Sequence, residues 1–158
     1  MRHGTTRRYG NEMEIQIRKP KLGQEHNLAE IRALSMKESL IAVGRYDEVR
    51  VRNRLLSNYA IDEVKVIYFE NIEIGFYSVN VTDNVCFINH LYVLPNYQGK
   101  GIGLKIIDII KSEYRGYVLR LNALIGSKAN EFYERNGFML IDCTKFDNVY
   151  ELNNIENG

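Results

Sequence analysis

A turn rich in glycine separates two apolar runs near the middle of the chain. Gly99, Gly101 and Gly103 fall within five residues, after the strand-like sequence LYVL and before the helix-like sequence LKIIDIIK. Glycine lowers the stability of a packed domain because it loses more conformational freedom on folding than any other residue. A helix N-terminus offers unpaired N–H groups and about half a positive charge, and glycines let an anion lie against them. The turn therefore predicts a phosphate site at the start of a helix.

Two phosphate-binding motifs can be excluded at this turn. The P-loop GxxxxGK[ST] fails because Gly101 follows Lys100, and the dinucleotide motif GxGxxG fails because Leu104 stands at its last position. The pattern that does fit is [QR]-x-x-G-x-[GA], from Gln98 to Gly103. Lys100 adds a positive charge, which suits a pyrophosphate. A flexible turn without a ligand is the alternative interpretation.

The rest of the chain alternates between strand and helix patterns. Apolar residues at a spacing of two predict strands, and apolar residues at a spacing of three and four predict helices. The expected strands cover 13–19, 63–70, 73–80, 85–94, 117–124, 138–146 and 149–154, and the expected helices cover 24–43, 47–58, 104–115 and 128–136. This order, β-α-α-β-β-β-α-β-α-β-β, predicts an α/β fold. We expect a mixed, mostly antiparallel sheet of six to seven strands with helices on both faces.

Turn and capping signals predict where several of these elements begin and end. Two hairpin turns are expected to centre on Asn71-Ile72 and on Asp147-Asn148. Ser127 is the expected N-cap of the last helix, and Gly137 the expected C′ residue after it.

Length and charge limit the domain organisation and the partners. The 158 residues suit one domain, which we place at 13–158, after a disordered leader or extension at 1–12. The net charge of +1 gives no overall attraction to nucleic acid or to an anionic membrane, and no apolar run reaches the length of a membrane span. We therefore expect neither partner. A nucleic-acid-binding arm built on the arginines of 1–12 remains an alternative.

The two cysteines carry little functional signal. Cys86 and Cys143 lie far apart and match no metal-binding spacing, so we predict no metal site. Two reduced thiols are typical of a cytoplasmic protein, which is the expected location.

Two separate segments resemble the GNAT superfamily of acyl-coenzyme A-dependent N-acyltransferases. The first is INHLYVLPNYQGKGIGLKII, which is similar to the coenzyme-binding strand, loop and helix of that family. The second is SKANEFYERNGF, similar to the family pattern A-x-x-F-Y-[ED]-[KR]-x-G-F. The order of the expected elements agrees with the family from about Glu14 to Leu152. The resemblance implies a GNAT-like sheet and acetyl-CoA as co-substrate.

The resemblance also implies a set of cofactor contacts. The strand that ends at Leu91-Tyr92-Val93 is expected to separate from the strand at 118–124, and the pantetheine arm of acetyl-CoA is expected to lie in the opening. The pyrophosphate is expected on main-chain N–H groups of the glycine turn. The residues assigned to the cofactor in this way are Leu91, Val93, Gln98, Gly99, Lys100, Gly101, Ile102, Gly103, Leu104, Asn130 and Tyr133.

The same resemblance suggests how the reaction would proceed. A neutral amine attacks the thioester carbonyl, and the leaving thiolate takes a proton from a phenol, for which Tyr133 is the candidate. Many relatives have a glutamate as base at the position occupied here by Phe87. His90 is the candidate base or water-holding residue, and Asn89 lies beside it. Strict alternation places His90 and Phe87 on opposite faces unless a bulge intervenes. The asparagine that is frequent in the family seven residues before the tyrosine is Gly126 here.

The predicted function is transfer of an acetyl group from acetyl-CoA to a primary amine of a small-molecule or peptide acceptor. The acceptor is expected in a groove between the two N-terminal helices, the Asn71 turn and the final hairpin. Five acids are candidates to attract a cationic amine, although scattered acids usually form a solvated surface: Glu48, Asp62, Glu63, Glu70 and Glu73. The alternatives are a non-catalytic CoA-binding sensor or partner module, and a longer acyl donor. A homodimer is also left open.

Overall fold

The computed structural model describes residues 14–155, so the leader expected at 1–12 lies outside the described residues. The strands are β1 (Gln16–Arg18), β2 (Val64–Phe69), β3 (Ile72–Thr82), β4 (Val85–Val93), β5 (Val118–Leu124), β6 (Met139–Cys143) and β7 (Asp147–Asn153). The helices are α1 (Glu25–Ala42), α2 (Glu48–Leu56), α3 (Ile102–Glu113) and α4 (Ala129–Arg135), with short 3-10 turns at Ile61–Glu63 and Pro95–Tyr97. The predicted order of strands and helices is confirmed.

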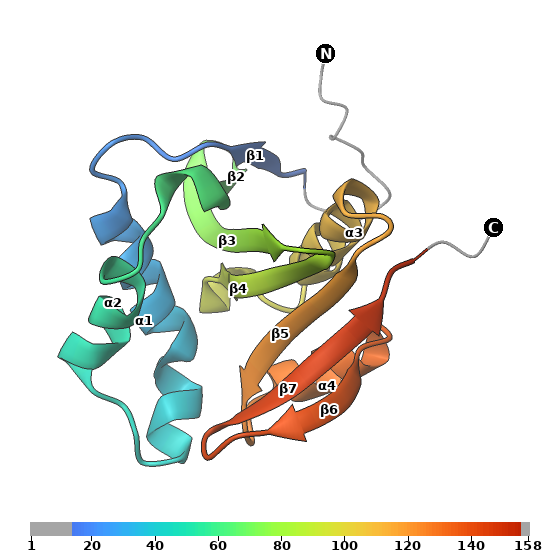
Figure 1. Ribbon diagram of the computed structural model, residues 1–158. Coiled ribbons are helices and arrows are strands. Elements are labelled where there is room, and N and C mark those ends of the chain that lie inside the picture. Colours follow the sequence, from blue (N-terminus) through green and yellow to red (C-terminus); the bar gives the residue numbers. More distant parts are fainter. Residues whose placement is uncertain (1–13, 156–158) are drawn as a thin grey trace.

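The seven strands of the described residues form one sheet, in the order β1-β2-β3-β4-β5-β7-β6 (Figure 1). Every pair of neighbours is antiparallel except β4 and β5, which run parallel in the centre of the sheet. Helix α3 makes the crossover that a parallel pair requires. The sheet is therefore mixed and mostly antiparallel, as the sequence predicts.

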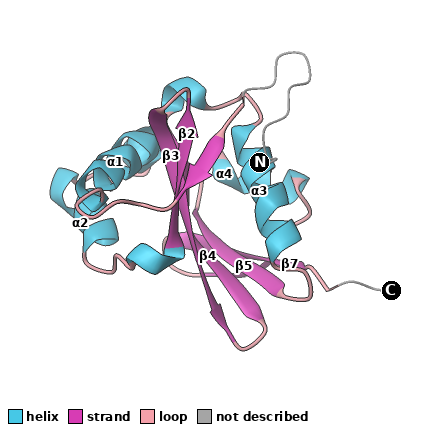
Figure 2. Cartoon of the chain, turned by 90° about the horizontal axis from the view of Figure 1, so that it is seen from above, coloured by secondary structure: helices cyan, strands magenta, loops and turns pink. Residues whose placement is uncertain are grey.

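Helices cover both faces of the sheet, as Figure 2 shows, with α1 and α2 on one side and α3 and α4 on the other. Under α3 the core contains four isoleucines that recur at helical spacing, Ile102, Ile106, Ile107 and Ile110, all buried. Burying one such side chain contributes about 1.5–3 kcal/mol, so this stripe fixes α3 firmly on the sheet. On the opposite face, Leu28 and Ile31 of α1 pack against Phe76 of β3.

Three local expectations are corrected by the structure. The β2–β3 turn centres on Glu70 and Asn71, whose φ angles are 51° and 65°, one residue before the expected position. Two positive φ angles are typical of the tight hairpin turns that match strand twist. The closing hairpin turns between Cys143 and Asp147, so Asp147 already belongs to β7. The N-cap of α4 is Lys128 rather than Ser127.

Two helix ends carry capping signals, of which only Gly137 was expected from the sequence. Asp47 caps α2, because its carboxylate accepts hydrogen bonds from the N–H groups of Val49 (3.0 Å) and Arg50 (2.8 Å). Gly137 follows α4 with a φ of 93°, as a C′ glycine should. Within 14–155, none of the helices combines the length and the apolar character needed to cross a bilayer.

Candidate active site

The two parallel strands at the centre of the sheet separate toward their C-terminal ends. β4 pairs with β5 only from Val85 to Ile88, although β4 continues to Val93. On its other side, β5 pairs with β7 along its whole length, from Val118 to Leu124. The main chain of β4 from Asn89 onward therefore faces an opening in the sheet where an extended ligand can lie against the strand.

A bulge in β4 lies at the start of this opening. Ser78 of β3 is opposite His90, and Val79 is opposite Ile88, which leaves Asn89 as the extra residue. A bulge of this kind shifts the alternation of the following side chains by one position. His90 and Phe87 consequently share one face of the sheet. This is the exception that the alternation argument allowed.

Gly75 of β3 fixes how closely β3 and β4 approach each other beside the opening. It lies opposite Val93, and a Cβ at this position would come within 2.3 Å of the main-chain oxygen of Tyr92. Any side chain there would push β4 away from β3.

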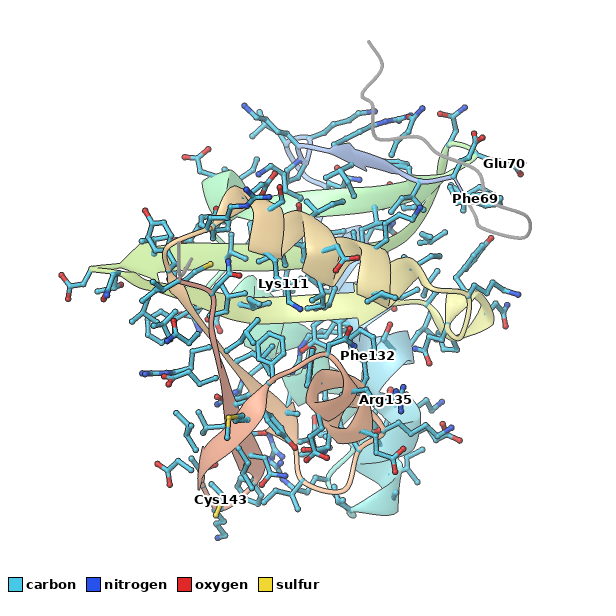
Figure 3. The ribbon with its side chains drawn as sticks, turned by 90° about the vertical axis from the view of Figure 1, so that its right-hand side faces the viewer. Phe69, Glu70, Lys111, Phe132, Arg135 and Cys143 are labelled. Carbon is cyan, nitrogen blue, oxygen red and sulfur yellow. The ribbon has the colours of Figure 1, made fainter. Side chains whose placement is uncertain are left out.

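The three glycines of the turn serve two different purposes. Gly99 and Gly101 have φ angles of +75° and +85°, and a Cβ on either would meet no protein atom within 4 Å. They are required by the left-handed backbone, and the space beside them is open. Gly103 lies inside α3, where a Cβ would come within 3.2 Å of the Phe132 ring of α4. Figure 3 labels Phe132 on α4, below α3. The third glycine therefore serves helix packing.

A cavity of about 740 Å³ joins the opening in the sheet to the N-terminus of α3. We call it the glycine-turn cavity. Nine of the candidate site residues line it: His90, Leu91, Val93, Gln98, Gly99, Gly101, Gly103, Leu104 and Tyr133. Three do not line it: Lys100, Ile102 and Asn130. Ile102 is buried in the core, and Lys100 is exposed.

Helix α1 and the glycine turn both contact the end of β4. The main-chain oxygen of Val93 accepts hydrogen bonds from the Gln98 side chain (2.7 Å) and from the Ser35 hydroxyl (3.1 Å). The side chain of Gln98 is thus engaged with the main chain of β4. Sequence reasoning missed Ser35, whose helical pattern gave no sign that it reaches this strand.

Asn130 connects three elements behind the cavity. Its amide nitrogen donates to the main-chain oxygens of Leu124 (2.8 Å) and Ser127 (2.9 Å). Its amide oxygen accepts from the side chains of Asn148 (2.8 Å) and Tyr150 (3.0 Å). These bonds join the end of β5, the start of α4 and the strand β7.

Tyr133 is a buried tyrosine whose phenol has a raised pKa. Its ring packs against Phe132, Phe138 and Tyr150. Burial and the nearby phenol of Tyr92 raise its pKa far above the ordinary value. Its hydroxyl forms no hydrogen bond with any other residue of the described part of the chain. The phenol therefore stays protonated at neutral pH and is available on the wall of the glycine-turn cavity.

A second cavity, of about 420 Å³, lies on the α1–α2 side of the sheet. We call it the arginine cavity, because five arginines line it: Arg32, Arg45, Arg50, Arg54 and Arg120. It shares wall residues with the glycine-turn cavity, among them Asn89, His90 and Tyr92. The two cavities therefore meet at the bulge of β4.

The surroundings of the arginine cavity agree only in part with the expected acceptor groove. Its walls come from α1, α2, β4, β5 and the closing hairpin, the last through Phe146 and Asp147. The Asn71 turn does not contribute, and its side chain accepts a hydrogen bond from Arg18 at 2.8 Å. None of the five acids considered from the sequence lines the cavity.

His90 lies where the two cavities meet. Its ring packs between those of Phe76 (5.9 Å between centroids) and Tyr92 (5.6 Å). Burial, followed by the charges of Arg32 and Arg54, lowers its pKa from 6.5 to about 4. Its Nδ1 is buried and has no hydrogen-bond partner among the described residues. His90 is therefore a neutral imidazole at pH 7.

The arginines were not identified from the sequence as site residues. Their signal is weak because they come from α1, the α1–α2 loop, α2 and β5. One sign was available: Leu28, Arg32, Met36 and Leu40 are spaced by four in α1, so Arg32 interrupts an apolar row.

The central parallel strands of the sheet separate beside a glycine-rich helix N-terminus, and a second cavity meets the first there. This arrangement is typical of an acyltransferase domain. A family model described as Acetyltransferase (GNAT) domain matches residues 60–140. The chain belongs to this family, and the resemblance noted from the two segments is confirmed. No curated protein matches the sequence.

Solved structures share this fold over nearly the whole chain. PaiA N-acetyltransferase from Thermoplasma acidophilum, in complex with coenzyme A, has a TM-score of 0.72 at 23% identity and covers 89% of this chain and 99% of its own. An acetyltransferase from Thermus thermophilus has a TM-score of 0.71 at 14% identity, covering 87% and 95%. The ribosomal-protein-S18-alanine N-acetyltransferase of Escherichia coli has a TM-score of 0.68 at 17% identity, covering 91% and 96%. At these identities the likeness establishes the shared fold.

Proposed function

We propose that the chain is an N-acetyltransferase that moves an acetyl group from acetyl-CoA to a primary amine by direct attack. The observation that carries this proposal is the meeting of two cavities at His90, one beside a glycine turn and one lined by polar side chains. A transfer reaction needs both substrates together, and two joined cavities provide for that.

Acetyl-CoA fits the glycine-turn cavity by its chemistry. Its pyrophosphate would lie against the first N–H groups of α3, where the helix dipole favours an anion and Gly99 and Gly101 leave open space. Its pantetheine arm would lie along β4 beyond Ile88, where β5 no longer pairs. Family membership and the coenzyme A in the Thermoplasma relative support this cofactor.

Direct attack is favoured over an acyl-cysteine intermediate because neither cysteine lines the two cavities. Cys86 is buried in the core, where burial raises its pKa to about 11. Cys143 lies exposed at the end of β6 (Figure 3). The amine nitrogen would then form its bond to the acetyl carbon, and the bond from that carbon to sulfur would break.

Tyr133 is the proposed proton donor to the departing thiolate. The raised pKa keeps the phenol protonated, so its O–H can donate to the sulfur as negative charge develops there, although a thiol, with an ordinary pKa of about 8.5, is the stronger acid. His90 is proposed to hold the amine or a water by a hydrogen bond rather than to take the full proton. The proton that the attacking nitrogen loses passes to the phenolate of Tyr133, or through that water to solvent, so that the phenol is restored. A lysine-type ammonium has a pKa of about 10.4, which a group with a pKa of about 4 cannot match as a base.

Release of the coenzyme A thiol from acetyl-CoA, measured over a panel of primary amines, tests the function. We expect amine-dependent release, and a Tyr133→Phe variant should lower kcat about a hundredfold, the usual contribution of a proton donor. Tyr117→Phe is the matched control, because Tyr117 packs against Tyr114 and lines neither cavity. Binding of acetyl-CoA without release for every amine would favour the non-catalytic CoA-binding module. Release from propionyl-CoA in parallel reports on acyl length.

A further inference from the structure

The arginine cavity carries a strong excess of positive charge. Five arginines line it against two aspartates, Asp47 and Asp147. One of these acids is already engaged, since the Asp47 carboxylate caps α2. Of the five arginines that line the cavity, only Arg120 forms an ion pair within the described residues, with Glu151. Even after that pair the cavity remains positive.

Arg32 shows the imbalance most clearly. Its side chain is only 8% exposed, yet no carboxylate among the described residues pairs with it. Its Nε donates to the Tyr92 hydroxyl (3.2 Å) and its Nη1 to the main-chain oxygen of Val51 (2.6 Å). Both acceptors are neutral. A buried charge without a counter-ion is costly, so a counter-ion is expected to come from a ligand.

Arg50 and Arg54 add two charges on one face of α2. They are four residues apart, so their side chains are neighbours on the helix, and like charges at this spacing destabilise an isolated helix. Neither side chain forms a side-chain hydrogen bond or an ion pair with another described residue, although the charge of Arg50 contributes to the lowered pKa of Asp47. Arg52, between them, pairs instead with Glu30 at 2.6 Å and does not line the cavity. Helix α2 thus has one arginine, Arg52, in an ion pair away from the cavity, and two, Arg50 and Arg54, that line the cavity.

Arg45 completes the wall from the loop before α2. Its guanidinium lies over the Phe146 ring, 3.4 Å from the centroid. This stacking holds the cation at the mouth between α2 and the closing hairpin without neutralising it. Planar guanidinium groups bind carboxylate and phosphate through paired hydrogen bonds.

We propose that the acceptor is a primary amine that also carries a carboxylate or phosphate group, with its anionic part bound by the arginine cavity. The proposal rests on the function proposed above and names the acceptor class for that site. The anion lies among Arg32, Arg50 and Arg54, and the amine points past His90 toward the opening beside β4. Polyamines are excluded as acceptors by the same charges.

The test compares amines that differ in charge. Acetyl transfer from acetyl-CoA is measured at low ionic strength with L-aspartate, O-phosphoethanolamine, ethanolamine and spermidine. Each charge-assisted hydrogen bond to an anion is worth about tenfold or more in affinity. We therefore expect kcat/KM for at least one of the two anionic amines to exceed that for ethanolamine by about a hundredfold, with spermidine slowest. Aspartate and O-phosphoethanolamine distinguish carboxylate from phosphate.

Variants of α2 connect this preference to the cavity. The double substitution Arg50→Gln with Arg54→Gln should lower the anionic-to-neutral ratio at least tenfold, and both side chains are exposed, so folding should survive. Arg52→Gln is the matched control on the same helix and should leave the ratio unchanged. Equal or faster transfer to spermidine, or an unchanged ratio in the double variant, overturns the proposal while the acetyltransferase function stands.

Calorimetry separates this proposal from the function it rests on. If none of the amines is acetylated, aspartate and O-phosphoethanolamine are titrated into the protein saturated with coenzyme A. Binding that weakens at least tenfold in the Arg50→Gln, Arg54→Gln variant supports the anion site even though the transfer reaction has failed. Absence of binding to the unchanged protein overturns the anion site as well.

Discussion

The two cavities differ in the part of the chain that builds them. The glycine-turn cavity offers main-chain groups, from the unpaired end of β4 and the N-terminus of α3, beside side chains such as that of Tyr133. The arginine cavity is lined by five arginine side chains that come from four separate segments. A main-chain surface recognises what all substrates of the family share, whereas side chains can be exchanged without changing the fold. The comparison indicates that the first cavity defines the reaction class and the second defines the acceptor.

The largest expected effect concerns Asn130, which the resemblance assigned to the cofactor. Asn130→Ala should lower the free energy of unfolding by about 4 kcal/mol, because several partly buried groups lose their partner at once. For a domain of this size that corresponds to a fall in Tm of roughly 10 °C. Thermal unfolding followed by circular dichroism measures it.

Asn136→Ala is the control for this change. The Asn136 side chain makes a single hydrogen bond, to the main-chain oxygen of Phe132 at 2.8 Å, so a loss of about 1 kcal/mol is expected. If Asn130 serves stability alone, the Kd for coenzyme A of the folded Asn130→Ala variant stays within about threefold of the unchanged protein. A much larger Kd would show that the Asn130 side chain also holds the cofactor. Recognition by main chain in one cavity and by side chains in the other would then no longer distinguish the two cavities.

A somewhat smaller effect concerns His90, on the wall that the cavities share. The pKa of His90 is about 4 in the folded chain and 6.5 ordinarily, so the unfolded chain binds the proton more tightly. Stability should therefore fall as the pH decreases from 6.5 to 4, by roughly 3 kcal/mol for this group. Urea unfolding of the unchanged protein and of His90→Gln across this range isolates the contribution of His90, since the carboxylates titrate in both. Parallel pH profiles would show that the pKa of His90 is not lowered in the folded chain, so that neither burial nor the arginines act on this imidazole.

The smallest effect concerns Gly101. Gly101→Ala and Gly23→Ala form a matched pair, because both glycines have a φ of +85° and neither would bring a Cβ within 4 Å of a protein atom. Both should lose about 1 kcal/mol of stability from the left-handed backbone. Only Gly101→Ala should weaken coenzyme A binding, by about tenfold, because its Cβ projects where the pyrophosphate is proposed. Calorimetric titration measures this, and equal affinities in the two variants would move the pyrophosphate away from the turn.

The sequence predicted the main-chain cavity far better than the side-chain cavity. The order of all the elements and the position of the glycine turn were readable because both depend on local spacing. The role of each glycine could be predicted only in part, because Gly103 is required by contact with the ring of Phe132, 29 positions further along the chain. The bulge at Asn89 depends on the register with β3, which local alternation does not contain. The arginine cavity assembles residues from Arg32 to Asp147, and no short window of sequence holds that arrangement.

Gly75 has a consequence for how the width of the opening is set. It lies across β4 from the opening and lines neither cavity, yet a side chain at this position would force β4 toward β5. The space for the thioester on one side of β4 thus depends on the missing Cβ of Gly75 on the other side of β4. A chain with a larger residue at position 75 could keep every group that meets the substrates and still have too narrow a passage for them.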